Sequence, residues 1–161
     1  MATKWEGTNK VEVKSATADQ VWPLLEDYCN FQKWLPTIDT CYKLEGEAGK
    51  PGVVRYCSTT IPLSLEGGDE KVTKFTKEKL VKIDPVQRFY TYQVLENNLG
   101  IPEARWEGTI QVLPVGDGKS GCEIHWTFAG DRSEVLTYED MLAFYDNSLK
   151  GMAKKIEDSL N

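Results

Sequence analysis

The sequence predicts an α+β fold, in which a curved antiparallel sheet of about seven strands wraps one long C-terminal helix, with two short helices after the first strand. Apolar residues recur at helical spacing in two parts of the chain, and they alternate with polar residues in the part between. Glycines, prolines and asparagines interrupt that alternation at short intervals. The chain has 161 residues and no low-complexity linker, so we expect residues 1–161 to form one domain.

The first helical segment follows a capping motif. Thr17 and Gln20 have the spacing of a capping box, and the apolar residues after them recur at helical spacing, which predicts a helix over residues 18–28. Because proline is tolerated only near a helix start, Pro23 indicates that the helix starts close to Gln20 or kinks. A second helical turn is expected over residues 31–35.

The middle of the chain predicts a meander of antiparallel strands. From Asp39 onward the apolar residues follow a period of two, and turn signals recur at residues 46–52, 67–68, 84–85, 97–102 and 116–121. His125 falls on the polar face of the last strand, so we expect it to face solvent rather than to act as a catalytic base. The clearest apolar faces comprise Trp106, Gly108, Ile110 and Val112 on one strand and Cys122, Ile124, Trp126 and Phe128 on the next.

The C-terminal segment predicts one long helix over residues 134–160. Its apolar stripe would face the apolar side of the sheet. Where the two layers do not close completely, we expect an internal cavity for a small hydrophobic molecule. The stripe consists of Tyr138, Met141, Leu142, Tyr145, Leu149, Met152, Ile156 and Leu160.

Composition and charge argue against several classes of partner. A net charge of −6 disfavours nucleic acid, because phosphate binding depends on lysine and arginine. No apolar run approaches the roughly 20 residues that span a bilayer. The N-terminus lacks the apolar core of a signal peptide, so we expect a cytoplasmic location with no membrane span. No obligate protein partner is indicated.

The cysteines and the single histidine indicate no metal site. Cys29, Cys41, Cys57 and Cys122 are widely spaced, with no Cys-x-x-Cys pair, and His125 is the only histidine. We therefore expect reduced thiols rather than a disulfide framework or a catalytic thiol, and no metal or cofactor.

Arg55 and Glu78 are the candidate catalytic residues. Arg55 shares a strand face with Val53 and Cys57, and Glu78 shares one with small or apolar neighbours, so both side chains can point inward. Inside a cavity they would need each other, since a lone buried charge costs several kcal/mol. The alternative is an exposed ion pair on a hairpin rich in lysine and glutamate, which spacing alone favours.

Aromatic and apolar residues are the candidate substrate-binding side chains. The alternative is that they simply fill the core, as buried aromatic residues mostly do. Tyr92 and Tyr145 stand out, because a buried phenol needs a hydrogen-bond partner, which a cavity with polar content would supply. The candidates are Tyr92, Trp106, Trp126, Tyr145 and Leu149.

The chain resembles the START-like, pollen-allergen-like superfamily with the helix-grip fold (polyketide cyclase/dehydrase and lipid transport), and within it the plant lachrymatory-factor synthases. The resemblance covers nearly the whole chain and depends on the order and spacing of several short motifs. They are Lys4-Trp5-x-Gly7, Trp22-x-Leu24-Leu25-x-Asp27, residues 36–41, Glu45-Gly46-Glu47, Gly52-x-Val54-Arg55-Tyr56, Lys77-Glu78-Lys79-Leu80-Val81 with Asp84, Tyr90-x-Tyr92, Trp126-x-Phe128 and Lys155-Ile156-Glu157.

The resemblance implies a specific reaction. The family enzyme rearranges an alkenyl sulfenic acid to a thial S-oxide without a cofactor. Glu78 would shuttle the proton between the sulfenic oxygen and the alkenyl carbon, while Arg55 would hold that oxygen and stabilise its charge. The sequence departs from the synthases at Trp106, near Ser148 and in a longer loop over residues 97–103, which implies a different pocket lining and a different substrate.

Three hypotheses follow for the function. The leading one is a lachrymatory-factor-synthase-like isomerase that acts through Arg55 and Glu78. The alternative is a non-catalytic carrier or receptor for a hydrophobic plant metabolite or lipid. A third is an interaction module with a filled core and no cavity.

Overall fold

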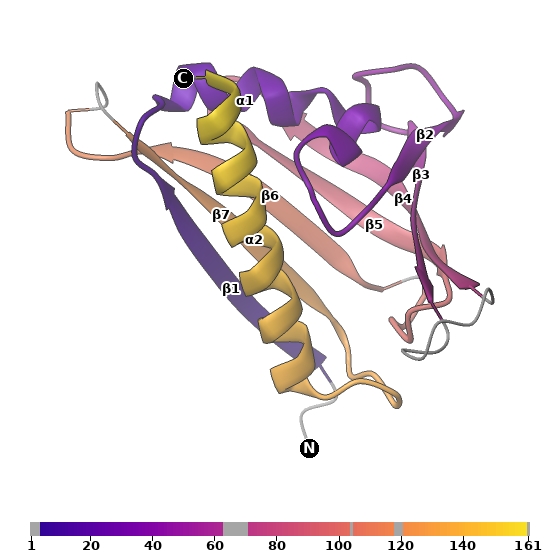
Figure 1. The fold of residues 1–161 in the computed structure, drawn as a ribbon. Coiled ribbons are helices and arrows are strands. Elements are labelled where there is room, and N and C mark those ends of the chain that lie inside the picture. Colours follow the sequence, from indigo (N-terminus) through magenta and orange to yellow (C-terminus); the bar gives the residue numbers. More distant parts are fainter. Residues whose placement is uncertain (1–3, 63–70, 104, 118–120, 161) are drawn as a thin grey trace.

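A seven-stranded antiparallel sheet curves around one long helix (Figure 1), which confirms the predicted α+β arrangement. The structure is a computed structural model, and it describes residues 4–62, 71–103, 105–117 and 121–160. Along the chain the elements are β1 (Lys4–Val13), α1 (Ala18–Glu26), the 3₁₀ helix η1 (Tyr28–Lys33), β2 (Thr40–Glu45), β3 (Val54–Pro62), β4 (Lys71–Asp84), β5 (Phe89–Asn97), β6 (Glu107–Pro114), β7 (Cys122–Asp131) and α2 (Tyr138–Leu160).

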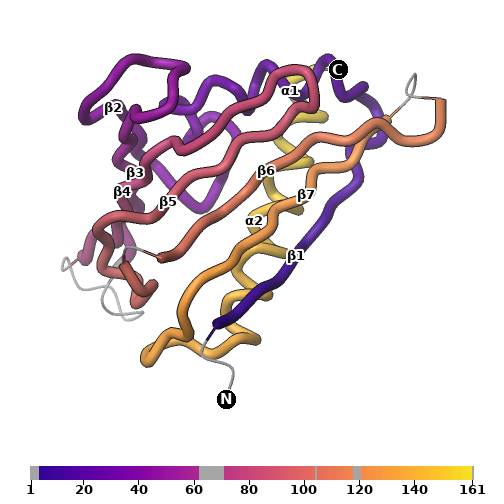
Figure 2. Tube along the Cα trace, turned by 180° about the vertical axis from the view of Figure 1, so that it is seen from behind, coloured from indigo at the N-terminus to yellow at the C-terminus, as the bar shows by residue number. Residues whose placement is uncertain are grey.

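The strands follow the order β1-β7-β6-β5-β4-β3-β2 across the sheet. All neighbours are antiparallel. The first two strands of the chain therefore occupy opposite edges, as the view from behind also shows (Figure 2). The connection between them contains α1 and η1, which lie across one end of the sheet.

The predicted alternation is confirmed on β6 and β7. Their inward residues are buried, and the residues between them are partly or fully exposed. His125 lies on the partly exposed face, where its Nε2 is 3.1 Å from Glu123 Oε1. The buried set comprises Gly108, Ile110 and Val112 of β6 and Cys122, Ile124, Trp126, Phe128 and Gly130 of β7.

The first helix begins earlier than Pro23 suggested. Thr17 and Gln20 form the complete capping box, which confirms that motif, and α1 begins at Ala18 with Pro23 inside it. The predicted start at residue 18 is confirmed, the later start that Pro23 suggested is not observed, and the helix ends at Glu26 rather than at residue 28. Proline leaves one helical carbonyl without its backbone donor, and here that carbonyl belongs to the exposed Asp19, where water can satisfy it. The next helical turn is η1, which begins at Tyr28 rather than at residue 31.

The long helix begins later than predicted, at Tyr138 rather than at residue 134. The preceding segment is a turn, in which Ser133 Oγ accepts two backbone N–H groups at 3.1 and 2.9 Å. Thr137 and Asp140 then exchange side-chain to backbone hydrogen bonds, both of 3.0 Å, which cap the helix. In the described part of the chain, no helix combines the length and the apolar character needed to cross a membrane.

Hydrogen bonds hold α2 against one edge of the sheet. Tyr138 donates its hydroxyl to the carbonyl of Glu6 at 2.7 Å, and Asn9 Nδ2 donates to the carbonyl of Leu142 at 3.0 Å. The helix thus crosses the concave face beside β1 and β7 (Figure 1). The inner face of β3, β4 and β5 lies farther from it, and the space between them contains the site described below.

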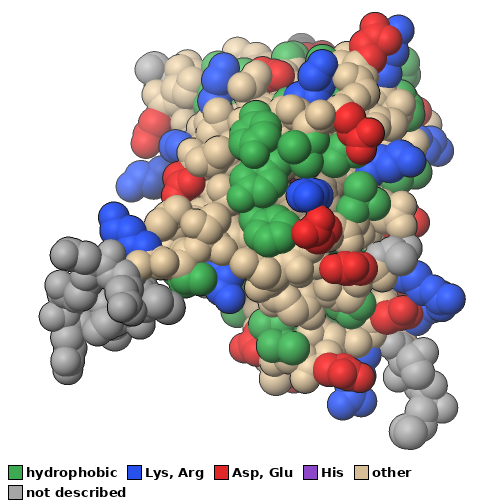
Figure 3. All heavy atoms as spheres, turned by 90° about the vertical axis from the view of Figure 1, so that its right-hand side faces the viewer, with side chains coloured by type: hydrophobic (Ala, Val, Ile, Leu, Met, Phe, Trp, Pro, Cys, Tyr) green, Lys and Arg blue, Asp and Glu red, His purple; other side chains and the backbone are tan. Residues whose placement is uncertain are grey.

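The outer face of β2, β3 and β4 carries a column of apolar side chains (Figure 3). Tyr42, which is 47% exposed, stacks on Tyr56 with ring centroids 5.0 Å apart. Tyr56 in turn stacks on Phe75 at 5.7 Å. Cross-strand aromatic pairs of this kind stabilise the pairing of neighbouring strands.

Two glycines allow large aromatic rings to lie flat on the sheet. A Cβ atom at Gly108 would lie 2.3 Å from Cζ of Tyr92, and one at Gly130 would lie 2.5 Å from Cε3 of Trp106. Both distances are far shorter than van der Waals contact. The two strands therefore need glycine at these positions to seat the rings.

We predict that Gly108→Ala lowers the free energy of unfolding by about 1–3 kcal/mol, because the added methyl group overpacks the strand beneath Tyr92. Urea unfolding of the variant and the wild type measures the difference. Glu107→Ala, at the exposed preceding position of β6, serves as control and should change stability little. Equal stability of Gly108→Ala and wild type would contradict the role assigned to this close contact.

Candidate functional site

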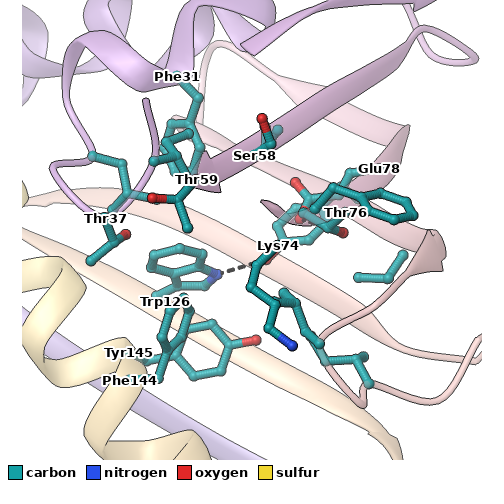
Figure 4. A pocket seen from close by; sticks show the side chains of 18 residues that line it. Phe31, Thr37, Ser58, Thr59, Lys74, Thr76, Glu78, Trp126, Phe144 and Tyr145 are labelled. Atoms are coloured by element: carbon teal, nitrogen blue, oxygen red, sulfur yellow. Dashed lines mark hydrogen bonds between the residues drawn. The ribbon is translucent and has the colours of Figure 1, made fainter. Parts of the chain in front are cut away.

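A cavity of about 80 Å³ lies between the N-terminal half of α2 and the inner face of β3, β4 and β5. Residues from η1, from the segment after it and from the loop after β5 complete the lining. Figure 4 shows side chains from these elements surrounding one space, with Glu78 and Thr76 on one side and Thr37 on the other. The lining side chains with a hydroxyl, amino or carboxylate group are those of Thr37, Ser58, Thr59, Lys74, Thr76, Glu78, Tyr92 and Tyr145.

Arg55 and Glu78 form a buried ion pair beside the cavity. They are directly opposed residues of β3 and β4. Both Nε and Nη2 of Arg55 approach the same carboxylate oxygen, Glu78 Oε1, at 2.9 and 2.7 Å. The arginine side chain is fully buried, whereas that of Glu78 is 11% exposed. The exposed alternative for this pair is therefore wrong.

Further contacts replace the water that the guanidinium loses on burial. Nη1 of Arg55 donates to the carbonyl of Tyr28 at 2.9 Å and approaches the hydroxyl of Tyr90 at 3.5 Å. The rings of Tyr28 and Phe31 lie 3.9 and 4.3 Å from the guanidinium carbon, within the range of cation–π attraction. Arg55 is thus enclosed by protein, and it is not among the side chains that line the cavity.

The second oxygen of Glu78 keeps most of its hydrogen-bonding capacity. Among the described residues, Oε2 accepts only a long hydrogen bond of 3.4 Å from Thr76 Oγ1. Thr37, which also lines the cavity, has a buried hydroxyl oxygen with no partner in the described part of the chain. A buried acceptor is costly when it has no partner, so these atoms favour a ligand or water with hydrogen-bond donors.

Two phenols add polar atoms to the same region. Tyr92 accepts a hydrogen bond from Trp126 Nε1 at 3.0 Å (Figure 4), and Tyr145 accepts one from Trp106 Nε1 at 3.3 Å. Burial raises the pKa of both tyrosines well above the usual value, so both hydroxyl groups stay protonated at neutral pH. A side-chain hydrogen bond with Tyr92 opposes part of this rise at Tyr145, so the two hydroxyl groups also interact with each other.

Four of the seven residues predicted for the site line the cavity: Glu78, Tyr92, Trp126 and Tyr145. Arg55 is not part of the lining, but it contacts lining residues, among them Glu78 and Phe31. Trp106 and Leu149, expected to contact the ligand, are buried outside the lining. This is a correction to the predicted site.

Packing explains why Trp106 and Leu149 do not reach the cavity. Trp106 lies over Gly130 and stacks on Phe128, with centroids 5.4 Å apart and planes 8° apart, so it supports Tyr145 from behind. Leu149 follows Tyr145 by one helical turn on the same face of α2. It is 1% exposed and is not part of the lining.

Some lining residues were missed from the sequence. Lys74 and Thr76 alternate in step with Glu78 along β4, so strand parity could have placed them on the same face. Phe31, Leu99 and Ile101 enter from η1 and from the loop after β5. No periodic pattern indicates where such segments lie, so no sequence signal could have found them.

Comparison with known families gives a match over most of the chain. The model of the family described as "Polyketide cyclase / dehydrase and lipid transport" matches residues 4–157. MLP-like protein 34 of Arabidopsis thaliana is 30% identical over 109 residues, which cover 66% of this chain and 32% of that protein. The chain therefore spans about a third of the length of this relative.

Solved structures share the fold over nearly the whole chain. Ginseng major latex-like protein 151 from Panax ginseng superposes with a TM-score of 0.73 at 20% identity and covers 98% of both chains. The protein XoxI from Bacillus cereus gives a TM-score of 0.68 at 19% identity, over 96% of this chain and 94% of its own. At such identities the likeness shows the helix-grip fold alone.

We predict that Arg55→Met lowers the free energy of unfolding by about 3–5 kcal/mol, because it leaves the carboxylate of Glu78 buried without its partner. The double variant Arg55→Met/Glu78→Leu should lose less than the sum of the two single variants, since it removes both charges. Urea unfolding of the wild type, the two single variants and the double variant gives the coupling free energy between Arg55 and Glu78.

Arg88→Met is the matched control for this cycle. Arg88 pairs with Asp19 at 2.9 Å, but the Asp19 side chain is 83% exposed. Loss of this exposed ion pair should therefore change the free energy of unfolding little. Additive effects at positions 55 and 78 would refute the energetic coupling.

Proposed function

Since this chain belongs to the polyketide cyclase / dehydrase and lipid transport family, we propose that it binds a small, largely apolar molecule that carries one hydrogen-bond donor. The single observation behind this proposal is that Glu78 lines a mostly apolar cavity while its Oε2 accepts only one long hydrogen bond among the described residues. A carboxylate oxygen in such surroundings is a strong acceptor, because little water competes for it. This supports recognition of a hydroxyl or N–H group.

The size of the cavity favours a small ligand. The cavity has a volume of about 80 Å³. A water molecule needs about 15 Å³ of cavity volume, so the cavity holds roughly five water molecules. An aromatic or short aliphatic body suits the lining of Phe31, Val94, Trp126 and Phe144. Lys74 lies in the lining as well and is partly exposed, so it supplies a positive charge without being deeply buried.

We predict that the protein binds phenol more tightly than toluene, because only phenol donates a hydrogen bond to Glu78. Glu78→Gln should weaken phenol binding by ~10-fold or more, the usual worth of a hydrogen bond to a charged group, and leave toluene unchanged. Isothermal titration calorimetry of both compounds gives the affinities, and circular dichroism checks that the variant folds.

Glu96→Gln is the control for the phenol experiment. Glu96 is more than half exposed and pairs with Lys77 outside the cavity, so its loss of charge should leave both affinities unchanged. Equal binding of phenol and toluene by the wild type would refute recognition of a donor by Glu78.

A second candidate function is cofactor-free proton transfer of the lachrymatory-factor-synthase type. The observation that favours it is the difference between the two oxygens of Glu78. Arg55 holds Oε1, while Oε2 accepts only a long hydrogen bond from Thr76, which suits it to act as the proton acceptor. Because Arg55 is enclosed by protein, its role in such a reaction would be to position Glu78 rather than to hold the substrate oxygen.

The enzymatic candidate predicts that purified protein converts alkenyl sulfenic acid, generated in the assay, to the thial S-oxide. Glu78→Gln should abolish turnover, because it removes the proton acceptor. Arg55→Leu should lower turnover, because Glu78 loses the partner that positions its carboxylate. Product analysis by gas chromatography checks this, and an equal yield with and without Glu78 would exclude catalysis by this residue.

A further inference from the structure

Cys41 and Cys57 form a buried thiol pair beside the cavity that the proposed function does not use. They are directly opposed residues of β2 and β3, and the Cys57 thiol donates to Cys41 Sγ at 3.3 Å. All four cysteines are free. Opposed residues of antiparallel strands have Cα atoms about 4.5–5.5 Å apart, which is within the span of a disulfide. A bond between these sulfur atoms therefore requires little movement of the strands.

We propose that Cys41 and Cys57 are a redox-active pair that a small hydroperoxide converts into a disulfide. The Cys41 thiolate attacks one peroxide oxygen, the O–O bond breaks, and the hydroperoxide leaves as an alcohol after taking up a proton. Cys41 is then a sulfenic acid. The Cys57 thiol attacks its sulfur, the S–S bond forms, and the sulfenic oxygen leaves as water with the thiol proton. A low-molecular-weight thiol returns the pair to the reduced form by two exchange steps.

The surroundings of the two sulfur atoms assign their roles. The hydrogen bond from Cys57 is the main cause that lowers the pKa of Cys41 to about 7. Burial opposes this shift, the Arg55 guanidinium and the Phe31 backbone assist it, and Glu78 opposes it. The same hydrogen bond and burial raise the pKa of Cys57 well above the usual range. Cys41 is thus the nucleophile, and Cys57 retains the proton until the second step.

Both sulfur atoms have a route to a small reagent. Cys41 lies on β2, the edge strand of the sheet, and is 9% exposed. Cys57 lines the cavity, so a molecule that enters there reaches the pair from inside. The other two thiols differ, because burial raises the pKa of Cys29 and raises that of Cys122 to about 11. The reaction should therefore be selective for the pair.

The test uses the full chain treated with one equivalent of cumene hydroperoxide at neutral pH, followed by alkylation of the remaining thiols. We expect the intact mass, measured before alkylation, to fall by two hydrogen atoms, and digestion of the alkylated protein to yield one peptide joined through Cys41 and Cys57. Dithiothreitol should reverse the change. A joined peptide that contains Cys29 or Cys122, or no loss of mass, would overturn the proposal. The mass measurement uses the wild-type protein and does not depend on ligand binding, so its outcome is independent of the proposed function.

Variants separate the two steps of the reaction. Cys57→Ser should stop at the sulfenic acid of Cys41, which dimedone traps, and Cys41→Ser should leave Cys57 reduced. Cys122→Ser serves as the matched control, because this thiol is buried on β7 at the other side of the sheet, and it should oxidise like the wild type. Equal dimedone labelling of Cys41→Ser and Cys57→Ser would refute the assigned roles.

Discussion

The burial of the Arg55 guanidinium is the constraint on which the site depends. A charge with no exposure to water is stable only where other groups replace its hydration. Glu78 supplies the opposite charge from the neighbouring strand, and Tyr28 supplies a carbonyl oxygen and an aromatic face. Because Arg55 lies on β3 and these partners lie on β4 and η1, the contacts of one guanidinium position three elements around the cavity.

Tyr28 connects this ion pair to the short helices at the end of the sheet. Its carbonyl oxygen accepts from Arg55, and its hydroxyl donates to the backbone carbonyl of Glu78 at 2.9 Å. The 3₁₀ helix is therefore bound to both strands at once. Phe31, from the same helix, covers the guanidinium and also lines the cavity. The contacts that stabilise the buried Arg55 charge thus also position η1 and, with it, the side of the cavity that Phe31 lines.

The ion pair also gives the two oxygens of one carboxylate different roles. Oε1 of Glu78 is paired with and oriented by Arg55, whereas Oε2 accepts only a long hydrogen bond from Thr76 at the edge of a mostly apolar cavity. The same arrangement suits recognition of a donor and acceptance of a proton, so both proposed functions depend on it. Cys57 lies two residues from Arg55 on β3, which brings the proposed redox pair into the same region.

The sequence by itself determined the elements and their inward faces, because the side-chain periods of helices and strands follow from local backbone geometry. It thereby identified Arg55 and Glu78 as side chains able to point inward. Only the tertiary structure decided that they are directly opposed and buried, that Trp106 lies behind the cavity, and that Cys41 meets Cys57. These features depend on strand register, sheet curvature and helix position, which bring together segments far apart in the chain and leave no local pattern.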